Sequence, residues 1–329
     1  MNGAADDREA RLNAALAQFG LAGAQVKLIR HNENEIYDVQ AEERRFALRI
    51  HIPAEGFAPL PLCGADGFAK RRAEAELLLL LAENGFRVQR PVPGKDGKTV
   101  QTLPGGVPAT LLCWLAGESF DALWKEADVP DGAAFAAGRA AGRLDVFTKD
   151  CVRRFASRRP RYGERTLPVL AQRLRAAREA GAVNDAQLAG LLAALAAMAP
   201  RMRAAERETG LCVCHADLSG GNLIWDGTDA SPIDFSLSGL ASPYFDLAGM
   251  FASFTRENVR KALLAGFEEG YGKRAELRLA EPYFALGILL FVCQRYEAAG
   301  DWDWFSSALA RWLRETFLPL ARGESFLAL

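Results

Sequence analysis

Hydrophobic positions in the first third of the chain predict a small sheet with one helix before it and one long helix within it. Apolar residues at helical spacing indicate a first helix over residues 6–19, and a stronger helical pattern runs from residue 67 to Gly85. Glycine there suits the left-handed conformation that commonly ends a helix. Short apolar runs between polar connections predict strands, which we expect to form a mixed sheet, at residues 24–30, 35–40, 45–51, 99–103 and 109–114.

The pattern becomes helical after residue 115, where we place a domain boundary. Apolar spacing predicts a helix over residues 131–147, and Asn184 suits the N-cap of another. Short strands interrupt the helices at residues 210–215, 222–226 and 231–235. The sequence therefore predicts an N-terminal domain of residues 1–115 and a larger, mainly helical C-terminal domain of residues 116–329.

Composition and charge are those of an ordinary soluble globular protein. Half of the 329 residues are hydrophobic, a quarter are charged, and the formal net charge is −1. This balance does not favour binding to nucleic acid or to a membrane surface. The first residues are polar and acidic, unlike a secretory signal. We expect a cytoplasmic protein without nucleic-acid or membrane partners, and the sequence leaves its oligomeric state open.

The cysteines do not form a metal-binding or disulfide pattern. Cys212 and Cys214 would point to the same face of a strand, with Cα atoms roughly 6.6 Å apart, where a disulfide would be strained. No Cys-x-x-Cys pair is present, and the chain has only 3 histidines, so a zinc site is not favoured. We interpret the cysteines as reduced and mostly buried.

The most informative polar residues lie between residues 215 and 236. Asp217 and Asn222 share a glycine-bearing loop after a predicted strand, and the following hairpin returns Asp234 beside them. Carboxylate and amide oxygens are the hard ligands that Mg²⁺ prefers. Phosphoryl transfer needs such a metal, together with a carboxylate that accepts or orients the proton of the attacking hydroxyl. These side chains can fill both roles.

This arrangement, H-x-D-x-x-x-x-N followed by I-D-F, resembles the aminoglycoside phosphotransferase and choline kinase family, distant relatives of protein kinases. The resemblance implies an α+β, two-lobed protein-kinase-like fold with a small N-terminal sheet-plus-helix lobe. It implies that Asp217 is the catalytic base, that Asn222 and Asp234 hold Mg²⁺, and that His215 braces the catalytic loop. Asp246 matches a family aspartate that supports this loop through hydrogen bonds.

The first domain carries further family features. Arg49 resembles the basic residue of the third strand that contacts the nucleotide phosphates, where a protein kinase has lysine. The planar guanidinium can bind phosphate oxygens bidentately, so arginine can still contact the nucleotide phosphates, with a different geometry from lysine. Glu74 resembles the acidic partner of that residue. Glu76 lies about 200° away round the helix, so both glutamates cannot face Arg49.

The remaining resemblance concerns the nucleotide, which is ATP or GTP. The turn over residues 31–37, which contains Asn34, resembles the family's nucleotide loop, and Trp114 and Leu115 lie in the segment that resembles the adenine-binding hinge. The resemblance implies nucleotide binding in the cleft between the lobes. The resemblance extends over residues 10–250. One departure from the family pattern is Asp145, which stands where many relatives have histidine. We expect this change to affect local packing rather than phosphate chemistry.

Each of these residues also has a structural interpretation. Aspartate or asparagine on a loop is usually a turn former or a cap, and Asp246 could be a helix N-cap. A lone Arg49 would usually lie at an edge or on the surface, Glu74 could belong to a solvated helix face, and His215 has a structural task even in the family.

Two clusters bear on the acceptor and point in opposite directions. A basic run could attract an anionic substrate or form a solvated face; its members are Arg153, Arg154, Arg158, Arg159, Arg161 and Arg165. An acidic and aromatic cluster suits a cationic amine, although its tryptophans could equally belong to the core; its members are Glu297, Asp301, Trp302, Asp303 and Trp304. Neither cluster decides the substrate.

We expect a Mg²⁺-dependent phosphotransferase that moves the terminal phosphoryl group of ATP or GTP to a hydroxyl of a small molecule, such as an amino-alcohol or an aminoglycoside-like compound. Two alternatives are a bacterial protein Ser/Thr kinase of the stress-response type and a non-catalytic nucleotide-binding module. A dinucleotide oxidoreductase is not favoured, because no Gly-x-Gly-x-x-Gly follows a strand. The sequence neither identifies the acceptor nor chooses between ATP and GTP.

Overall fold

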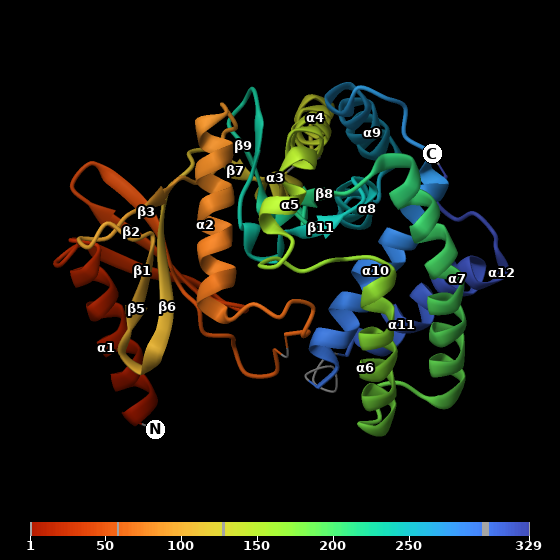
Figure 1. The fold of residues 1–329 in the computed structure, drawn as a ribbon, viewed down its shortest axis with the longest axis horizontal. Coiled ribbons are helices and arrows are strands. Elements are labelled where there is room, and N and C mark those ends of the chain that lie inside the picture. Colours follow the sequence, from red (N-terminus) through yellow and green to blue (C-terminus); the bar gives the residue numbers. More distant parts are fainter. Residues whose placement is uncertain (1, 58, 127–128, 298–302, 329) are drawn as a thin grey trace. The chain divides into compact units, whose positions relative to one another are not determined.

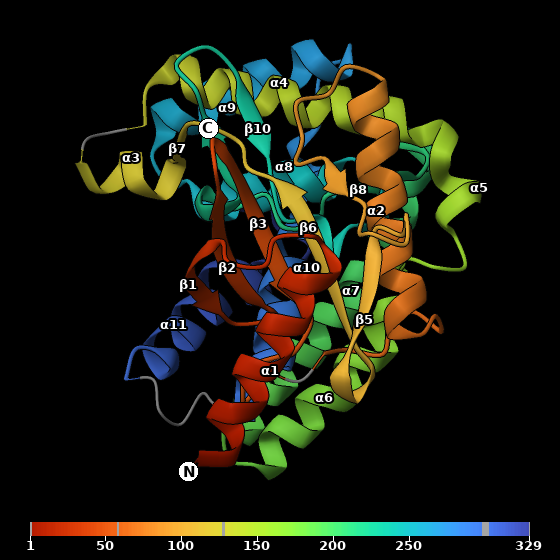
Figure 2. The same ribbon diagram turned by 90° about the vertical axis from the view of Figure 1, so that its left-hand side faces the viewer.

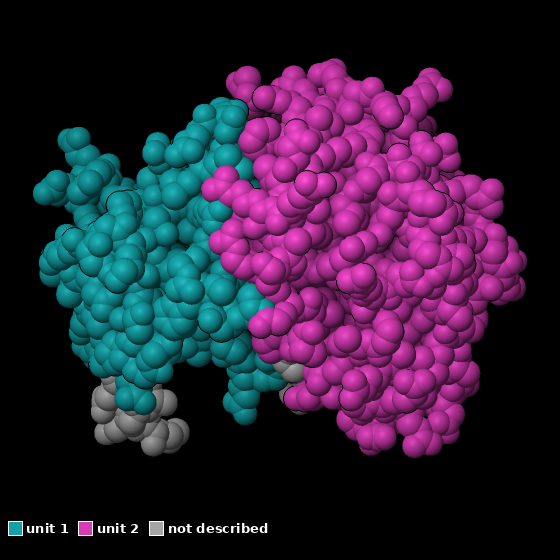
Figure 3. Space-filling view, in the orientation of Figure 1, with its two compact units in different colours: residues 1–57, 65–116 teal, residues 58–64, 117–329 magenta. Residues whose placement is uncertain are grey.

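The computed structural model describes residues 2–57, 59–126, 129–297 and 303–328, and the chain divides into two compact units. Unit 1 comprises residues 1–57 and 65–116, and unit 2 comprises residues 58–64 and 117–329 (Figure 3). The grouping of residues 58–64 with the second unit was not predicted from the sequence. These residues lie in a stretch without periodicity, so local patterning carried no signal for it.

Unit 1 is built on an antiparallel sheet with strand order β1-β2-β3-β6-β4, in which β5 pairs with β6 (Figures 1 and 2). Its strands are β1 (Gln25–His31), β2 (Glu35–Ala41), β3 (Arg44–Ile50), β4 (Pro91–Val92), β5 (Val100–Leu103) and β6 (Val107–Cys113). Every pairing described in this sheet is antiparallel. The expected mixed sheet is therefore wrong, because short hairpin connections join β1 to β2, β2 to β3 and β5 to β6, and such connections require antiparallel strands.

The helices of unit 1, α1 (Asn2–Gln18) and α2 (Gly67–Glu83), pack on this sheet. Successive side chains on a strand point to opposite faces, so neighbouring residues of β3 meet different helices. Leu48 is fully buried in one hydrophobic core with Leu16 of α1, whereas Arg49 contacts α2. The alternation along β3 thus places one charged side chain against α2 while the other face builds the core.

Unit 2 is mainly helical and contains small antiparallel sheets (Figure 1). Its helices are α3 (Phe120–Glu126), α4 (Asp131–Thr148), α5 (Val152–Phe155), α6 (Leu167–Glu179), α7 (Asp185–Thr209), α8 (Tyr244–Ser253), α9 (Glu257–Tyr271), α10 (Leu277–Arg295), α11 (Phe305–Trp312) and α12 (Leu318–Arg322). Its strands are β7 (Glu118–Ser119), β8 (Cys212–Cys214), β9 (Leu223–Trp225), β10 (Ala230–Pro232) and β11 (Gly239–Ala241). The short strands β7 and β11 were not predicted, since two or three residues carry no periodicity.

The closest helix packing in unit 2 joins α4 and α9, which lie side by side in both ribbon views (Figures 1 and 2). A Cβ atom added to Gly138 of α4 would lie 2.0 Å from the carbonyl oxygen of Leu263. A Cβ atom added to Gly266 of α9 would lie 1.9 Å from the carbonyl oxygen of Phe135. The two helices therefore touch backbone to backbone through glycine.

Two helices of unit 2, α7 and α10, are long and apolar enough to cross a membrane by length and composition. Core helices of folded proteins pass the same test. In α10, 61% of the apolar window is buried inside the unit, where Tyr283, Leu286 and Leu289 are fully enclosed. Helix α10 is thus a core element of unit 2, and α7 buries one face, including Leu191 and Met198.

Candidate active site

The loop between β8 and β9 brings Asp217 and Asn222 into direct contact. The Asn222 Nδ2 donates to Asp217 Oδ2 at 2.7 Å and to the Asp217 carbonyl oxygen at 2.9 Å. The Asn222 side chain is buried, and its Oδ1 has no hydrogen-bond partner among the described residues. A buried amide oxygen without a donor is unfavourable. This atom therefore fits a cation, since a hard amide oxygen is a ligand that Mg²⁺ accepts.

Asp234 lies two residues after the end of β10, on the neighbouring loop. Strands β9 and β10 pair with Leu223 opposite Pro232, and the Ile233 N–H donates to the Asn222 carbonyl oxygen at 2.9 Å. Asp234 itself has φ 64° and ψ 68°, a left-handed conformation that aspartate tolerates better than most residues. Asp217, Asn222 and Asp234 thus lie on two loops that the hairpin holds together.

His215 links these two loops through its ring. Its Nε2 donates to the Ile233 carbonyl oxygen at 2.9 Å, and its Nδ1 accepts from the Asp217 N–H at 3.3 Å. The ring is fully buried and packs edge-on against Phe235 with centroids 4.5 Å apart. Because both ring nitrogens are engaged, His215 holds the loop rather than presenting a nitrogen to a reactant.

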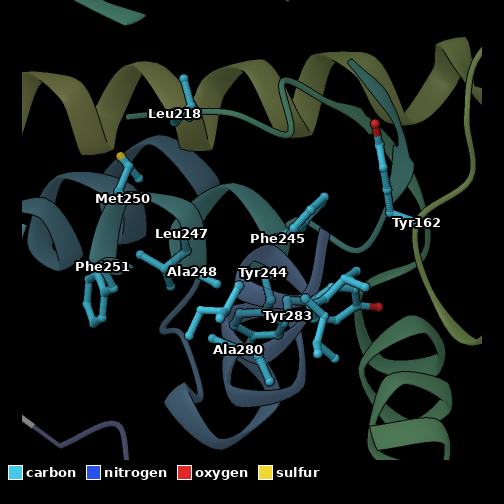
Figure 4. Close-up of a cluster of buried hydrophobic side chains, with 14 of the residues drawn as sticks. Tyr162, Leu218, Tyr244, Phe245, Leu247, Ala248, Met250, Phe251, Ala280 and Tyr283 are labelled. Atoms are coloured by element: carbon cyan, nitrogen blue, oxygen red, sulfur yellow. The ribbon is translucent and has the colours of Figure 1, made fainter. Parts of the chain in front are cut away.

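Asp246, in the first turn of α8, anchors the start of the loop. Its carboxylate accepts from the backbone N–H groups of His215 and Ala216, both at 2.7 Å. Burial raises the pKa of Asp246 to about 6, although these N–H groups and the neighbouring Asp145 act in the opposite direction. Helix α8 is fixed in turn by apolar side chains that pack around Tyr283 (Figure 4). Asp246 therefore ties the loop between β8 and β9 to the core of unit 2.

Asp145 lies behind the loop in a cluster with Cys212 and Cys214, whose ligand atoms lie within 4.8 Å of one another. Burial raises the pKa of Asp145 well above its usual range, and the nearby Cys212 and Asp246 add to this effect. The Cys212 Sγ donates to Asp145 Oδ1 at 3.3 Å, and the Cys214 Sγ contacts the Ser242 carbonyl oxygen at 3.3 Å. The raised pKa favours the neutral form of Asp145, which is the less costly form of an acid at this buried position.

In unit 1 the predicted pair of Arg49 and Glu74 is present. Arg49 Nη1 donates to Glu74 Oε1 at 2.6 Å, and both side chains are almost completely buried. Arg71 Nη1 lies 3.4 Å from the other oxygen of Glu74. Glu74, which the family resemblance assigned as the partner of Arg49, is therefore the α2 glutamate that faces β3.

Asn34 belongs to a buried polar group that the sequence did not reveal. Its Oδ1 accepts from His51 Nδ1 at 2.7 Å, and His51 Nε2 lies 3.1 Å from Thr110 Oγ1. Burial lowers the pKa of His51 well below its usual value, and the charges of Arg71 and Arg49 add to this effect. The available signal for His51 was its position two residues after Arg49, on the same face of the strand predicted over residues 45–51.

The hinge residues Trp114 and Leu115 differ in what they can offer a nucleotide. The Trp114 N–H donates to the Arg45 carbonyl oxygen at 3.1 Å, and the Arg45 guanidinium stacks on the Trp114 ring 3.7 Å from its centroid. The Trp114 N–H is therefore already hydrogen-bonded within unit 1 and is not available to a nucleotide. Of the predicted hinge amides, Leu115 is the candidate that remains.

The basic run separates into side chains with different surroundings. Arg153 and Arg154 are exposed, as a solvated face requires. Arg161 pairs with Glu206 at 2.8 Å. Arg159, in contrast, is 2% exposed and contacts the loop that follows Asp234. Arg159, Arg161 and Arg165 also line a pocket of about 410 Å³ in unit 2.

Part of the acidic and aromatic cluster, Asp301 and Trp302, lies outside the described residues. Trp304 is half exposed and packs against Phe291 and Trp312, with ring centroids 6.0 Å and 6.4 Å away. Trp304 is thus a surface-facing extension of the core.

Asp121 and Arg159 contact the site loops without having been predicted as site residues. A Cβ atom added to Gly220 would lie 2.3 Å from Asp121 Oδ1, so the carboxylate packs directly on the glycine pair of the catalytic loop. Neither contact has a sequence signal, because both depend on segments distant in the chain.

The antiparallel sheet with its Arg49–Glu74 pair, together with the Asp217, Asn222 and Asp234 loops, defines a phosphotransferase of protein-kinase-like fold. The chain matches the model of the phosphotransferase enzyme family over residues 25–282, and it belongs to this family. The predicted family and the class of enzyme, a kinase, are confirmed.

Individual relatives are distant in sequence. Amicoumacin kinase of Bacillus subtilis (strain 168) is 23% identical over 225 residues, which cover 68% of this chain and 61% of that protein. The solved structure of a microcompartment-associated aminopropanol kinase has a TM-score of 0.71 at 19% identity, covering 94% of this chain and 98% of that one. Amicoumacin kinase hAmiN, solved with AMP-PNP, Ca²⁺ and Ami, has a TM-score of 0.63 at 16% identity, covering 93% and 90%. These similarities confirm the expected two-lobed fold.

Proposed function

We propose that the protein transfers the terminal phosphoryl group of ATP or GTP to a hydroxyl of a small molecule in a Mg²⁺-dependent reaction. One observation carries the proposal. The buried Asn222 amide holds the Asp217 carboxylate with its Nδ2, while its Oδ1 is left without a donor among the described residues. Buried polar atoms are rarely left unsatisfied in native structures, and a bound cation would satisfy this one.

Asn222 Oδ1 and the Asp234 carboxylate would hold Mg²⁺, and the bound ion would neutralise charge on the phosphates. Asp217 would accept the proton of the attacking hydroxyl through its carboxylate. Its contact with Asn222 fixes the direction of that carboxylate, which favours one orientation of the acceptor. His215 and Asp246 would keep the loop in place through hydrogen bonds to its backbone.

Unit 1 would bind the nucleotide, and unit 2 would supply catalysis and the acceptor site. Arg49 would contact the phosphates, with its guanidinium oriented by Glu74, whose other oxygen pairs with Arg71. The Leu115 backbone would contact the adenine or guanine. Asn34 would shape the nucleotide loop through its bond with His51.

For the acceptor, we place an amino-alcohol first. One structural relative is named as an aminopropanol kinase, and the curated relative is named as an amicoumacin kinase. Both names describe kinases of small molecules, so a small-molecule acceptor is favoured over a protein. A reaction that consumes ATP or GTP also supports the expected cytoplasmic location.

The first prediction concerns Asp217. Asp217→Asn keeps the shape of the side chain but removes the proton acceptor, so acceptor-dependent turnover should fall by about 10²- to 10⁴-fold while nucleotide binding is kept. The measurement is nucleotide consumption with Mg²⁺ and a panel of alcohols, amino-alcohols, aminoglycosides and proteins. Asp229→Asn, at an exposed position in the β9–β10 turn, is the control.

A variant Asp217→Asn that turns over within a few-fold of the parent would contradict the role of Asp217 as base. Tight nucleotide binding by the parent, without turnover on any acceptor of the panel, would favour the non-catalytic alternative.

A further inference from the structure

The Asp234 loop is held by one buried arginine from a distant part of unit 2. Arg159 is 2% exposed and lies between α5 and α6. Its Nε donates to the Ser238 carbonyl oxygen at 2.6 Å. Its Nη2 donates to the carbonyl oxygens of Phe235 at 2.9 Å and Ser236 at 2.8 Å. One guanidinium thus spans the short helical turn that directly follows Asp234.

The same segment holds the loop farther along. The Tyr162 hydroxyl donates to the Leu237 carbonyl oxygen at 2.7 Å, and the Tyr162 N–H donates to the Leu240 carbonyl oxygen at 2.8 Å. The Leu240 N–H donates to the Pro160 carbonyl oxygen at 2.8 Å. Residues 159–162 therefore fix the chain from the end of the Asp234 turn into β11.

This support matters because Asp234 has a left-handed backbone, which an L-residue adopts at an energetic cost. A conformation of this kind persists only where surrounding contacts determine it. The carbonyl groups of the turn converge on the guanidinium, and a planar fork of N–H donors can bind several of them at once. A lysine ammonium keeps the charge but cannot reproduce that fork.

We propose that Arg159 is a positioning residue that sets the conformation of the Asp234 loop and thereby the affinity of the site for Mg²⁺. The proposal rests on the proposed function, because it gives Asp234 the task of holding the metal. In this role Arg159 would act through the backbone carbonyl groups that it binds. Partners that orient metal ligands typically change metal affinity or activity by about 10- to 100-fold when they are removed.

The first test measures the loop without metal or nucleotide. In hydrogen exchange of the full-length protein, residues 235–240 should exchange faster in Arg159→Met and Arg159→Lys than in the parent. Arg161→Met is the matched control, since the Arg161 side chain pairs with Glu206 rather than with the loop carbonyls. Equal protection of residues 235–240 in the parent, Arg159→Lys and Arg161→Met would overturn the proposal.

The second test measures nucleotide binding over a range of Mg²⁺ concentrations. The Mg²⁺ concentration for half-maximal binding should rise by about 10- to 100-fold in Arg159→Met, while metal-free nucleotide affinity stays unchanged. If Arg159→Met does not fold, Arg159→Lys replaces it, with a rise of at least about threefold expected. A folded variant with the Mg²⁺ dependence of Arg161→Met would overturn the role of Arg159. A parent protein whose nucleotide binding ignores Mg²⁺ would instead contradict the proposed function.

Discussion

At the scale of one residue, Asp246 anchors the loop between β8 and β9, and burial of its ionised carboxylate is energetically unfavourable. Its carboxylate accepts two backbone N–H groups, yet burial still raises its pKa to about 6. The folded protein therefore keeps a proton on Asp246 between about pH 4 and pH 6, where the unfolded chain has already released it. The contribution of this group to the free energy of unfolding is fully present below about pH 4 and is lost as the pH rises through about 6.

Replacing Asp246 with asparagine should remove this pH dependence. Asp246→Asn adds a constant penalty, since its amide nitrogen would face one of the loop N–H donors. Relative to the variant, the parent should lose roughly 3 kcal/mol of stability between about pH 4 and pH 7. Urea unfolding of both proteins across this range measures the difference. Stability curves that stay parallel would contradict the raised pKa of Asp246.

At the scale of elements, glycine decides how closely α4 and α9 approach. Gly138 and Gly142 on α4 face Gly266 and Gly270 on α9, and at each position an added Cβ atom would lie within 2.5 Å of the other helix's backbone. Side chains therefore cannot be accommodated without separating the helices. Since α4 also carries Asp145, this packing sets the position of the group behind the catalytic loop.

Gly266→Ala should destabilise unit 2, because the new methyl group would meet the Phe135 carbonyl oxygen at 1.9 Å. Overpacking of this kind typically costs about 1–3 kcal/mol. The control is Gly287→Ala in α10, where nothing lies within 4 Å of the added Cβ atom. That variant should gain about 0.5–1 kcal/mol from the lower entropy of its unfolded chain. Thermal unfolding compares the two, and equal shifts would show that α4 and α9 can move apart freely.

At the scale of the whole molecule, each unit has a hydrophobic core of its own. Leu48 belongs to the core of unit 1 and Leu289 to that of unit 2, and both are fully buried. A chain with separate cores can depart from two-state unfolding, since each core can be lost by itself.

Leu48→Ala and Leu289→Ala should each lower the stability of one unit by about 2–5 kcal/mol, because each leaves a cavity in a different core. Hydrogen exchange in mild urea should show lost protection in unit 1 for Leu48→Ala and in unit 2 for Leu289→Ala. The two variants serve as controls for each other. Equal loss of protection in both units for either variant would mean that the units unfold together.

The sequence by itself determined the features that depend on neighbouring residues. Periodicity placed β1 to β3 and α2. The family resemblance assigned Glu74 as the partner of Arg49, and helical geometry allowed only one of Glu74 and Glu76 to face it. Asp217, Asn222 and Asp234 could be brought together from sequence because a short hairpin separates them. The roles of these residues remain predictions.

Tertiary structure alone decided the contacts between distant segments. In the sequence, Arg159 belongs to a charged run. In the structure it is buried against Phe235 and Ser238, which lie more than seventy positions later in the chain. Asp145 lies near Asp246 because α4 packs against β8 and α8 in unit 2. Local periodicity reports which face of an element is apolar, but it does not report which distant segment covers that face. The covering segment determines whether a charged side chain is buried, so this burial cannot be predicted from the local sequence pattern.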